Sequence, residues 1–451
     1  MTSPTRSPTS AASPPAAACD ADDAAVKLAS YWHDTAAPFA GAAPGPVAGR
    51  VDVAVVGGGF TGLSAALALA RRGASVAVVE AAHVGAGASG RNGGQCNNGF
   101  AQDFAAVEAR FGFERAVALY RAFDAAVDTV ERLVGEEGID CAFARTGKLK
   151  LAAKPAHAEK LARARDALHR GADPDVAFVP REALAGEIGT ERYHGGLVFP
   201  KSASLHMGRF VVGLAEAATR AGARIHEGAA VRRLTRIGRT DAHTVETARG
   251  TLRADQVLLA TGPSRAGPFF RYRRRIVPIG SFIVVTEPLS RARLDALLPT
   301  RRMCTTTQNI GHYFRVTPDD RLLFGGRARF ALSSATSDAK SGRVLEAGMV
   351  ETFPALAGTR LDWCWGGIVD MTQDRLPRAG QHEGLYYSMG YSGHGTQMST
   401  HMGQVMAAVM AGDRDANPWS GLDWPAIKGH FGPPWFLPLV GAYYKFQDWR
   451  H

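Results

Sequence analysis

The 451-residue chain lacks any apolar run long enough to cross a membrane, and it contains few cysteines. A membrane-spanning helix needs about 20 mostly apolar residues, and no stretch of this sequence approaches that length. The five cysteines are scattered, odd in number and without a C-x-x-C pair, which argues against both a disulfide framework and a zinc site. We therefore expect a cytoplasmic protein with no membrane span and no metal.

The first residues lack the apolar core of a secretory signal peptide. Apart from Met1 and Arg6, residues 1–18 are only Ser, Thr, Pro and Ala. Their low apolar content predicts a disordered tail, which we place at residues 1–27. A targeting segment is the alternative interpretation of this stretch.

Acidic residues are outnumbered, which leaves a formal charge of +10 and a sequence pI near 9.5. Such a balance suits nucleic acid, an anionic membrane surface or an acidic substrate. The basic residues are dispersed, however, and the densest run, Arg271–Arg275, fits a solvated strand end. Because salt screens exposed charges beyond about 8 Å, dispersed charge is weak evidence for a polyanion, and we expect no nucleic-acid partner.

Residues 51–80 show the order strand, glycine turn, helix, strand and acid. Val51–Val56 is apolar and rich in β-branched residues, which is typical of a buried parallel strand. The helical run Leu63–Arg72 follows the turn, and Ser75–Val79 is a second strand. Glu80 comes eighteen residues after the last glycine of the turn, near the spacing of a ribose-binding carboxylate.

The glycines of this turn each have a mechanical reason. Gly57 permits a tight turn out of the strand, Gly59 lets the backbone approach a pyrophosphate, and Gly62 lets the helix pack closely on the sheet. The free N–H groups and the dipole of the helix N-terminus then favour phosphate. The sequence therefore predicts a dinucleotide-binding fold.

A second loop, Gly85–Gln95, helps to decide which dinucleotide binds. It is full of small residues and carries one arginine and several amide or hydroxyl groups. Such a loop can lie flat against a large ligand, with Arg91 available to a phosphate and Asn92 or Gln95 to a polar ring edge. A flexible surface loop is the alternative.

Val53–Gln95 resembles the amino-terminal signature of the D-amino-acid oxidase (DAO) superfamily, which includes glycine oxidase and sarcosine oxidase. The similarity is greatest to γ-glutamylputrescine oxidase-like members, and it extends over about residues 28–447. Its motifs are specific for flavin and not for substrate. The further stretches that resemble this subgroup are Ser30-Tyr31-Trp32, Trp365–Asp370, Gly390–Gly395 and Tyr443-Tyr444-Lys445.

The resemblance implies an α/β fold in which a Rossmann-like FAD-binding domain, of the glutathione-reductase and DAO type, is interleaved with an α+β substrate domain on a largely antiparallel sheet. We expect the FAD-binding domain at residues 28–100, 195–270 and 366–451, and the substrate domain at 101–194 and 271–365. Helical spacing over 101–138, a strand at Gly280–Thr286 and a hairpin of His312–Val316 with Leu322–Phe324 fit this division.

The carboxy-terminal motif repeats the strand-to-helix turn. Leu385–Met389 is a predicted strand, and Thr396–Met410 is a predicted helix that stops before Gly412. The resemblance implies that this helix points at the pyrimidine edge of FAD, where reduction builds negative charge. It also implies that Val231 lies against adenine. The expected cofactor-binding residues are Gly57, Gly59, Phe60, Thr61, Gly62, Glu80, Ala81, Ala88, Ser89, Arg91, Asn92, Gly93, Gly94, Gln95, Val231, Thr261, Gly262, Gly367, Gly390, Ser392, Gly393, His394, Gly395 and Thr396.

Three side chains are candidates for substrate chemistry. His394 could be an acid, base or charge partner, although a packed histidine beside the cofactor is the favoured interpretation. Tyr313 and Arg327, on opposite arms of the predicted hairpin, could offer a hydroxyl donor and a carboxylate clamp. Sarcosine-oxidase-like members attach flavin through cysteine; here Gly367 stands at the matching place, with Cys364 three residues earlier, which favours non-covalent FAD.

The resemblance therefore implies an FAD-dependent oxidase of an amine or N-substituted amino acid, with O2 as the acceptor. The products would be an imine, then an aldehyde or oxo acid, and hydrogen peroxide. A dehydrogenase that passes electrons to a quinone or carrier protein is the near alternative. A non-catalytic or RNA-associated flavoprotein is a more distant one. The sequence does not indicate the oligomeric state.

Overall fold

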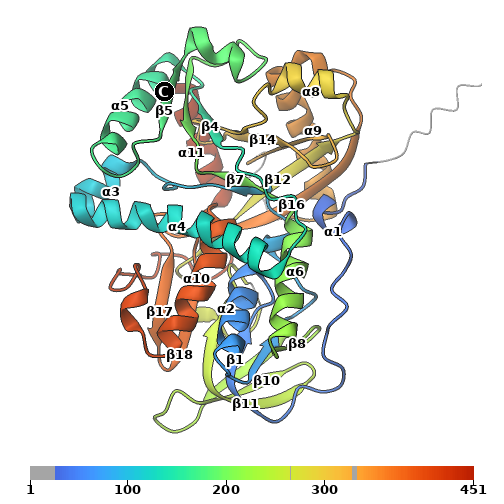
Figure 1. Ribbon diagram of the computed structural model, residues 1–451, viewed down its shortest axis with the longest axis vertical. Helices are drawn as coiled ribbons and strands as arrows, with labels where there is room; N and C mark the ends of the chain where they lie inside the picture. Colours follow the sequence, from blue (N-terminus) through green and yellow to red (C-terminus); the bar gives the residue numbers. More distant parts are fainter. Residues whose placement is uncertain (1–25, 265, 328–332, 451) are drawn as a thin grey trace, which may run out of the picture.

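The computed structural model describes residues 26–264, 266–327 and 333–450. Two large sheets lie one above the other along the long axis of the molecule, with helices packed beside each (Figure 1). This is the α/β architecture of a Rossmann-like domain joined to an α+β domain. Most of the tail expected at 1–27 falls outside the described residues, but Lys27 already forms a β-bridge with Trp363.

The first sheet has a parallel centre. Strands β18, β11, β1, β2 and β8 are parallel neighbours in that order, β17 adds an antiparallel edge, and β9 and β10 extend from β11 as an antiparallel ribbon. The bounds are β1 Arg50–Val56, β2 Val76–Val79, β8 Arg224–His226, β9 Val231–Arg236, β10 His243–Thr247, β11 Gly250–Leu259, β17 Arg378–His382 and β18 Leu385–Met389.

Strand β1 is buried on both faces, as its β-branched sequence predicts. Val53 and Val55 pack into the cluster shared with α2 (Phe60–Arg71), α6 (Met207–Arg220) and α10 (Gly395–Met410). Ala54 and Val56 pack into a second cluster with the β9–β11 ribbon. Figure 1 shows the three helices side by side in the lower half of the molecule.

The second sheet is antiparallel except where β13 pairs with β4. Its order is β16-β12-β15-β14-β13-β4-β6-β5. The bounds are β4 Lys148–Leu151, β5 Ala177–Pro180, β6 Gly195–Phe199, β12 Val277–Thr286, β13 Met303–Thr306, β14 His312–Val316, β15 Leu322–Gly326 and β16 Leu361–Met371. A two-stranded ribbon, β3 (Gln95–Cys96) with β7 (Ala203–Ser204), is separate from both sheets.

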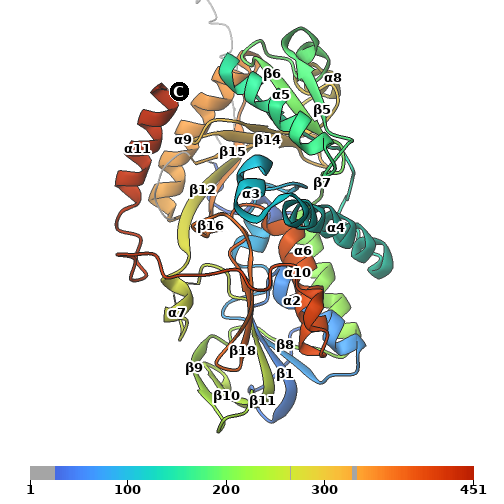
Figure 2. The ribbon, with the colours of Figure 1, turned by 90° about the vertical axis from the view of Figure 1, so that its left-hand side faces the viewer.

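The remaining helices pack mainly around the second sheet and between the two sheets. In Figure 2, α9 and α11 lie together on one side of the upper half, and α5 lies on the other. Their bounds are α1 Tyr31–Asp34, α3 Phe104–Phe111, α4 Phe113–Glu137, α5 Pro155–His169, α7 Phe270–Arg273, α8 Arg291–Leu297, α9 Ala335–Thr352 and α11 Leu437–Arg450.

Several elements differ from the sequence-based expectation. The helical stretch 101–138 is two helices, α3 and α4, because Gly112 between them has a φ of +79°. The arginine run at 271–275 was predicted as a strand end and instead includes the short helix α7, with Tyr272 buried. Helix α9 lies within residues 271–365, where the predicted elements are a strand and a hairpin. Strands β6 and β16 both belong to the second sheet, so its strand pairing crosses the expected boundaries at 195 and 366.

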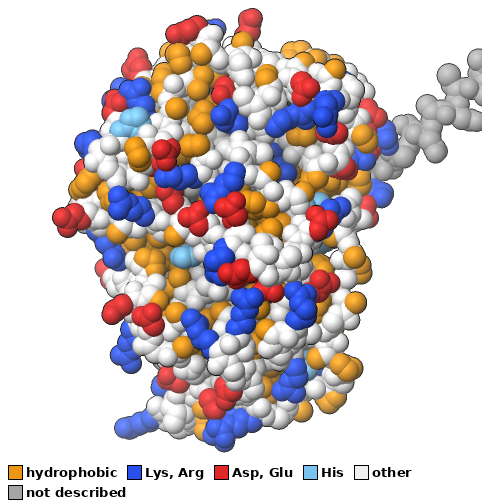
Figure 3. All heavy atoms as spheres, viewed as in Figure 1, with side chains coloured by type: hydrophobic (Ala, Val, Ile, Leu, Met, Phe, Trp, Pro, Cys, Tyr) orange, Lys and Arg blue, Asp and Glu red, His pale blue; other side chains and the backbone are white. Residues whose placement is uncertain are grey.

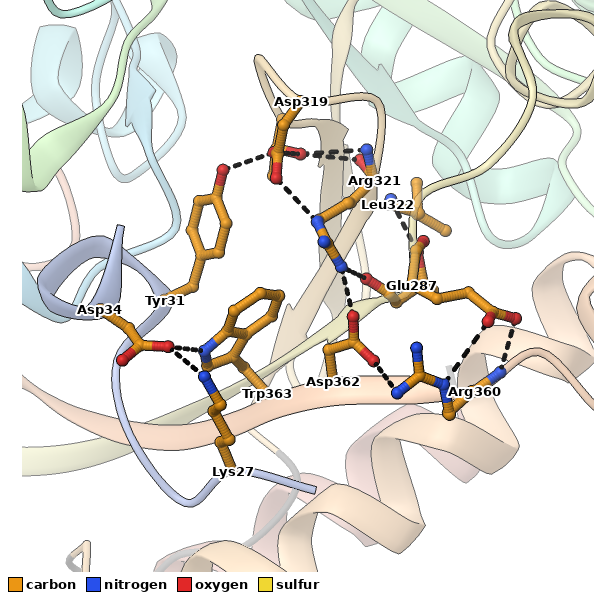
Figure 4. A network of polar contacts seen from close by, with 12 residues as sticks. Lys27, Tyr31, Asp34, Glu287, Asp319, Arg321, Leu322, Arg360, Asp362 and Trp363 are labelled. Atoms are coloured by element: carbon orange, nitrogen blue, oxygen red, sulfur yellow. Dashed lines mark hydrogen bonds and ion pairs between the residues drawn. The ribbon is translucent and has the colours of Figure 1, made fainter. Parts of the chain in front are cut away.

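The segment before β1 is tied to both halves of the molecule. Tyr31 donates a 2.5 Å hydrogen bond to Asp319 in the β14–β15 turn, and Asp34 accepts from Trp363 and pairs with Lys27 (Figure 4). Ser30 Oγ donates to Gly90 O at 2.7 Å, and Trp32 Nε1 donates to Asn92 O at 2.6 Å. This leader therefore holds the second glycine-rich loop against the second sheet.

The surface carries mixed charge. Figure 3 shows Lys and Arg side chains interspersed with Asp and Glu over the face seen in Figure 1. The described residues on this face therefore form no extended basic surface that could bind a polyanion. Across the described ranges, no helix combines the length and hydropathy needed to cross a membrane. Cys96, Cys141, Cys304 and Cys364 are all buried and unpaired.

Candidate active site

One cavity of about 1260 Å³ lies where the carboxyl ends of the first sheet face the second sheet. Ligand pockets commonly measure roughly 300–1,000 Å³, so this one can hold a dinucleotide and a further small molecule. Every predicted cofactor-binding residue lines it except Gly62, Gly94 and Gly390, and the three predicted catalytic side chains line it as well. The fold therefore brings motifs from both ends of the chain to one site.

The first glycine turn has no space for side chains. Gly57 leaves β1 with a φ of +117°, and a Cβ there would lie 2.5 Å from the carbonyl oxygen of Ala260. A Cβ on Gly62 would lie 2.0 Å from the Gly57 oxygen, which explains why Gly62 is needed although it does not line the cavity. Helix α2 begins at Phe60, three residues earlier than predicted, so its first turn is part of the cavity wall.

Glu80 fixes this turn at the end of β2. Its Oε2 accepts a hydrogen bond from the Gly58 N–H at 2.7 Å, and its Oε1 accepts from Ala82 N at 2.9 Å. The carboxylate lines the cavity beside Ala81. It is therefore placed at the end where a dinucleotide fold receives a ribose.

The second loop joins the two sheets across the cavity. Ser89 Oγ accepts from the Phe60 N–H at 3.0 Å, and Arg91 Nε donates to Gly366 O on β16 at 2.7 Å. The Asn92 side chain is engaged within the loop, where it donates to the Ser89 oxygen and accepts from Gly94 N. The Gln95 amide donates to Cys304 O at 3.3 Å. Arg91 thus has its Nε engaged on β16.

The carboxy-terminal turn is held by a buried carboxylate that the sequence analysis did not single out. Asp370 Oδ2 accepts from Gly390 N at 2.6 Å, and the Asp370 carbonyl accepts from Ser392 N at 3.1 Å. Burial raises the pKa of Asp370 to about 6, although these backbone N–H groups act in the opposite direction. Asp370 therefore ties the second sheet to the start of α10.

His394 is the N-cap residue of α10 and is neutral in this environment. Burial, followed by the charges of Lys148 and Lys150, lowers the pKa of its imidazole to about 3. Its ring packs edge-on against Phe123, with centroids 5.7 Å apart. Within the described chain, its Nδ1 has no hydrogen-bond partner. A buried neutral ring suits a packed residue or a neutral hydrogen-bonding group better than a charge partner.

Tyr313 and Arg327 line the cavity from the second sheet. The Tyr313 hydroxyl lies 3.0 Å from Ser281 Oγ on β12, and burial raises the pKa of the phenol to about 12. Its ring fills space that Gly93 and Gly325 leave free. Arg327 follows the end of β15 and donates to Asn309 O at 2.9 Å, and burial lowers the pKa of its guanidinium. Both are polar groups facing a shared space.

The sequence analysis did not single out two further polar residues of the wall, Lys148 and Lys150 on β4. Their signal was the alternation Lys-Leu-Lys-Leu, which indicates a strand with one apolar face. The sequence could not show that the polar face lines a cavity.

The cavity wall suits a dinucleotide with an electron-rich ring. Helices α2 and α10 both start on the wall, without a side-chain cap and without an acidic residue in the first turn. Such ends bind anionic groups through N–H donors and the helix dipole. In the described chain no cysteine lines the cavity, and Cys364 donates to Asp338 O on the far side of β16. A flavin here is held without a bond to cysteine.

Comparisons with known proteins agree with this geometry. The chain is 31% identical over 402 residues to gamma-glutamylputrescine oxidoreductase of Escherichia coli K12, an alignment that covers 88% of this chain and 92% of that protein. The crystal structure of glycine oxidase from Geobacillus kaustophilus superposes with a TM-score of 0.67 at 23% identity, covering 80% of this chain and 95% of that one. That of L-proline dehydrogenase from P. horikoshii gives 0.67 at 20% identity, covering 83% and 96%.

The DAO family model, described as FAD dependent oxidoreductase, matches residues 52–409. That span includes the first glycine turn, both sheets and nearly all of α10. The chain belongs to the DAO family of FAD-dependent oxidoreductases.

Proposed function

We propose that this protein oxidises an amine or N-substituted amino acid, of the γ-glutamylputrescine kind, at the carbon next to nitrogen. A primary amine R–CH2–NH2 loses two electrons and two protons to give R–CH=NH, while O2 takes them up as H2O2. Water then converts the imine into R–CHO and ammonia. Such a reaction belongs to polyamine breakdown.

A single observation carries the proposal: the glycine turns of the first sheet and the polar face of the second open into the same cavity. When bound, FAD supplies the oxidising ring, and the protein supplies binding, orientation and electrostatics. The similarity to gamma-glutamylputrescine oxidoreductase, which extends over 92% of that protein, supports an amine as the substrate.

The chain's own residues would position the amine. Tyr313 presents a neutral hydroxyl from the second sheet, which can donate to a substrate oxygen or accept from its nitrogen. His394 presents a neutral ring at the start of α10, which avoids repelling a substrate cation. Since oxidation of a neutral amine requires no obligate base, no catalytic triad is expected.

The test is anaerobic mixing of the purified holoenzyme with a panel of amines and amino acids, followed by the flavin absorbance. We expect γ-glutamylputrescine to bleach the flavin band. Under air, each primary amine consumed should yield one ammonia and one H2O2. Bleaching with little peroxide would replace the oxidase by a dehydrogenase, and bleaching by simple amino acids alone would refute the polyamine assignment. No bleaching by any amine would refute the proposal.

A further inference from the structure

Two ammonium groups project from one face of β4 into the cavity. Lys148 and Lys150 line the cavity, whereas Leu149 and Leu151 pack into the apolar core of the second sheet. Side chains alternate between faces along a strand, so the alternating sequence places both lysines on the cavity side. Neither lysine belongs to the glycine motifs.

In the part of the chain that the structure describes, neither ammonium group has a carboxylate partner. Lys148 Nζ donates to the carbonyl oxygen of Asn98 at 3.0 Å and lies 4.3 Å from the centroid of the Phe199 ring. Among the described residues, Lys150 Nζ has no hydrogen bond, and neither lysine forms an ion pair. A buried cation without a counter-charge is costly, so this arrangement suits an anion that arrives with a ligand.

The neighbouring acids are already engaged with other cations. Asp103 is the acid whose charge acts on Lys150, and it pairs with Lys160 at 2.6 Å. Asp124 and Asp173, which act on Lys148, pair with Lys201 at 3.1 and 3.0 Å. Burial accordingly lowers the pKa of Lys148 to about 7 and also lowers the pKa of Lys150. Among the described residues, the acids nearest to the two lysines are therefore already paired with another cation.

The lysines lie on the substrate side of the cavity. On the second sheet, Lys150 pairs with Thr305 of β13, and Thr305 pairs with Tyr313 of β14. Both lysines also lower the pKa of His394 at the start of α10. The pyrophosphate turn is on the other sheet, at the Gly57 end of α2. The lysine pair is thus associated with the residues expected near the reacting ring.

We infer that Lys150, with Lys148 beside it, binds the carboxylate of the substrate. This inference rests on the proposed amine oxidation and deepens it by naming the residues that bind the carboxylate. The carboxylate binds the two ammonium groups, and the amine end of the same molecule extends toward the His394 end of α10.

The first test measures binding without turnover. Glutarate, a dicarboxylate with no amine, is titrated into the FAD-loaded protein, and binding is followed by the change in the flavin spectrum. We expect wild type and Lys340→Met to bind alike, since Lys340 is exposed on α9 and does not line the cavity. Lys150→Met should raise the Kd about ten- to hundredfold, the effect of losing a charge-assisted hydrogen bond. Lys150→Arg should restore most of the affinity.

The second test changes the ligand instead of the protein. γ-Glutamylputrescine is compared with its analogue in which the α-carboxylate is a carboxamide. Wild type should lose about ten- to hundredfold in kcat/KM on the analogue, whereas Lys150→Met should use both compounds equally poorly. FAD content and Tm of each variant show whether it is folded.

The two proposals fail in different ways. If glutarate does not bind wild type, or binds Lys150→Met as tightly, the carboxylate subsite is wrong even if amines are oxidised. Equal kcat/KM for the carboxylate and the carboxamide in wild type has the same meaning. If glutarate binding depends on Lys150 but no amine bleaches the flavin, the subsite holds a carboxylate and the amine oxidation is what fails.

Discussion

Gly367 on β16 lies directly against the backbone of Arg91: a Cβ at position 367 would come within 2.6 Å of the Arg91 carbonyl oxygen. The contact is fixed by the bond from Arg91 Nε to the neighbouring Gly366 oxygen. A side chain at 367, cysteine included, would push the second glycine-rich loop off the second sheet. Non-covalent FAD therefore follows from backbone packing as well as from the residue type.

The first prediction concerns how FAD is retained. Precipitation of the yellow protein with acid should leave all flavin in the supernatant and a colourless pellet. Cys364→Ser should bind FAD as wild type does, because the Cys364 thiol bonds to Asp338 O and not to the cavity. Colour that stays with the pellet would contradict non-covalent binding.

The second prediction concerns Gly62. An alanine there would place its Cβ 2.0 Å from the Gly57 oxygen, so the glycine turn or α2 must move. Overpacking of this kind costs about 1–3 kcal/mol, and we expect Gly62→Ala to lower both Tm and FAD content. The matched control is Gly135→Ala at an exposed position of α4, where a Cβ meets nothing within 4 Å. It should be stabilised by about 0.5–1 kcal/mol, and equal behaviour of the two variants would contradict the packing argument.

The third prediction is a pH dependence set by Asp370. Its pKa in the folded protein is raised from 3.8 to about 6, which at about 1.4 kcal/mol per unit is on the order of 3 kcal/mol. Because the folded protein holds this proton more tightly than the unfolded chain, the stabilisation is fully present below about pH 4. It is lost as the pH rises through 6.

The measurement is the free energy of unfolding of wild type and Asp370→Asn between pH 4.5 and 8. Asparagine keeps an oxygen that can accept the Gly390 N–H and has no charge to bury. The stability of the variant relative to wild type should therefore increase as the pH rises to about 6 and level off above it. A constant or decreasing difference would show that Asp370 is not the titrating group.

The fourth prediction concerns Tyr313. Tyr313→Phe keeps the ring that fills the space beside Gly93 and Gly325, so FAD content should not change. It removes the hydroxyl expected to contact substrate, and a neutral hydrogen bond contributes about 0.5–1.5 kcal/mol. We expect kcat/KM to fall about two- to tenfold. Ser281→Ala removes only the hydrogen-bond partner of the Tyr313 hydroxyl, at 3.0 Å, and should lower kcat/KM less. A larger fall in Ser281→Ala than in Tyr313→Phe would show that the Tyr313 hydroxyl has only a structural role.

Local patterns explain what the sequence predicted. Gly57, Glu80 and the turn before α10 were identifiable because a strand-to-helix turn around a phosphate requires glycine at fixed offsets and an acid after the second strand. The structure brings these residues to one cavity wall. Their contacts with FAD stay predictions, as do the parts assigned to His394 and Arg327.

The rest depended on tertiary structure. The pattern Lys-Leu-Lys-Leu at β4 is the same for a strand with one solvent-exposed face as for one that borders a cavity, so Lys148 and Lys150 gave no distinguishing signal. Asp370 looked like the end of a flavin motif, and only the fold shows its carboxylate beneath Gly390. From the sequence, Gly112 could be a tolerated glycine within a helical stretch or a break; its φ of +79° shows that it is a break.

The leader has a consequence for shortened versions of this protein. Ser30 and Trp32 donate hydrogen bonds to the Gly90 and Asn92 carbonyls, so the segment before β1 supports the second glycine-rich loop, which is expected to contact FAD. A fragment that begins at the start of β1 would retain every glycine of the signature. It would lose the hydrogen bonds from Ser30 and Trp32 to that loop. A protein that starts at β1 should therefore retain less FAD and lose its yellow colour.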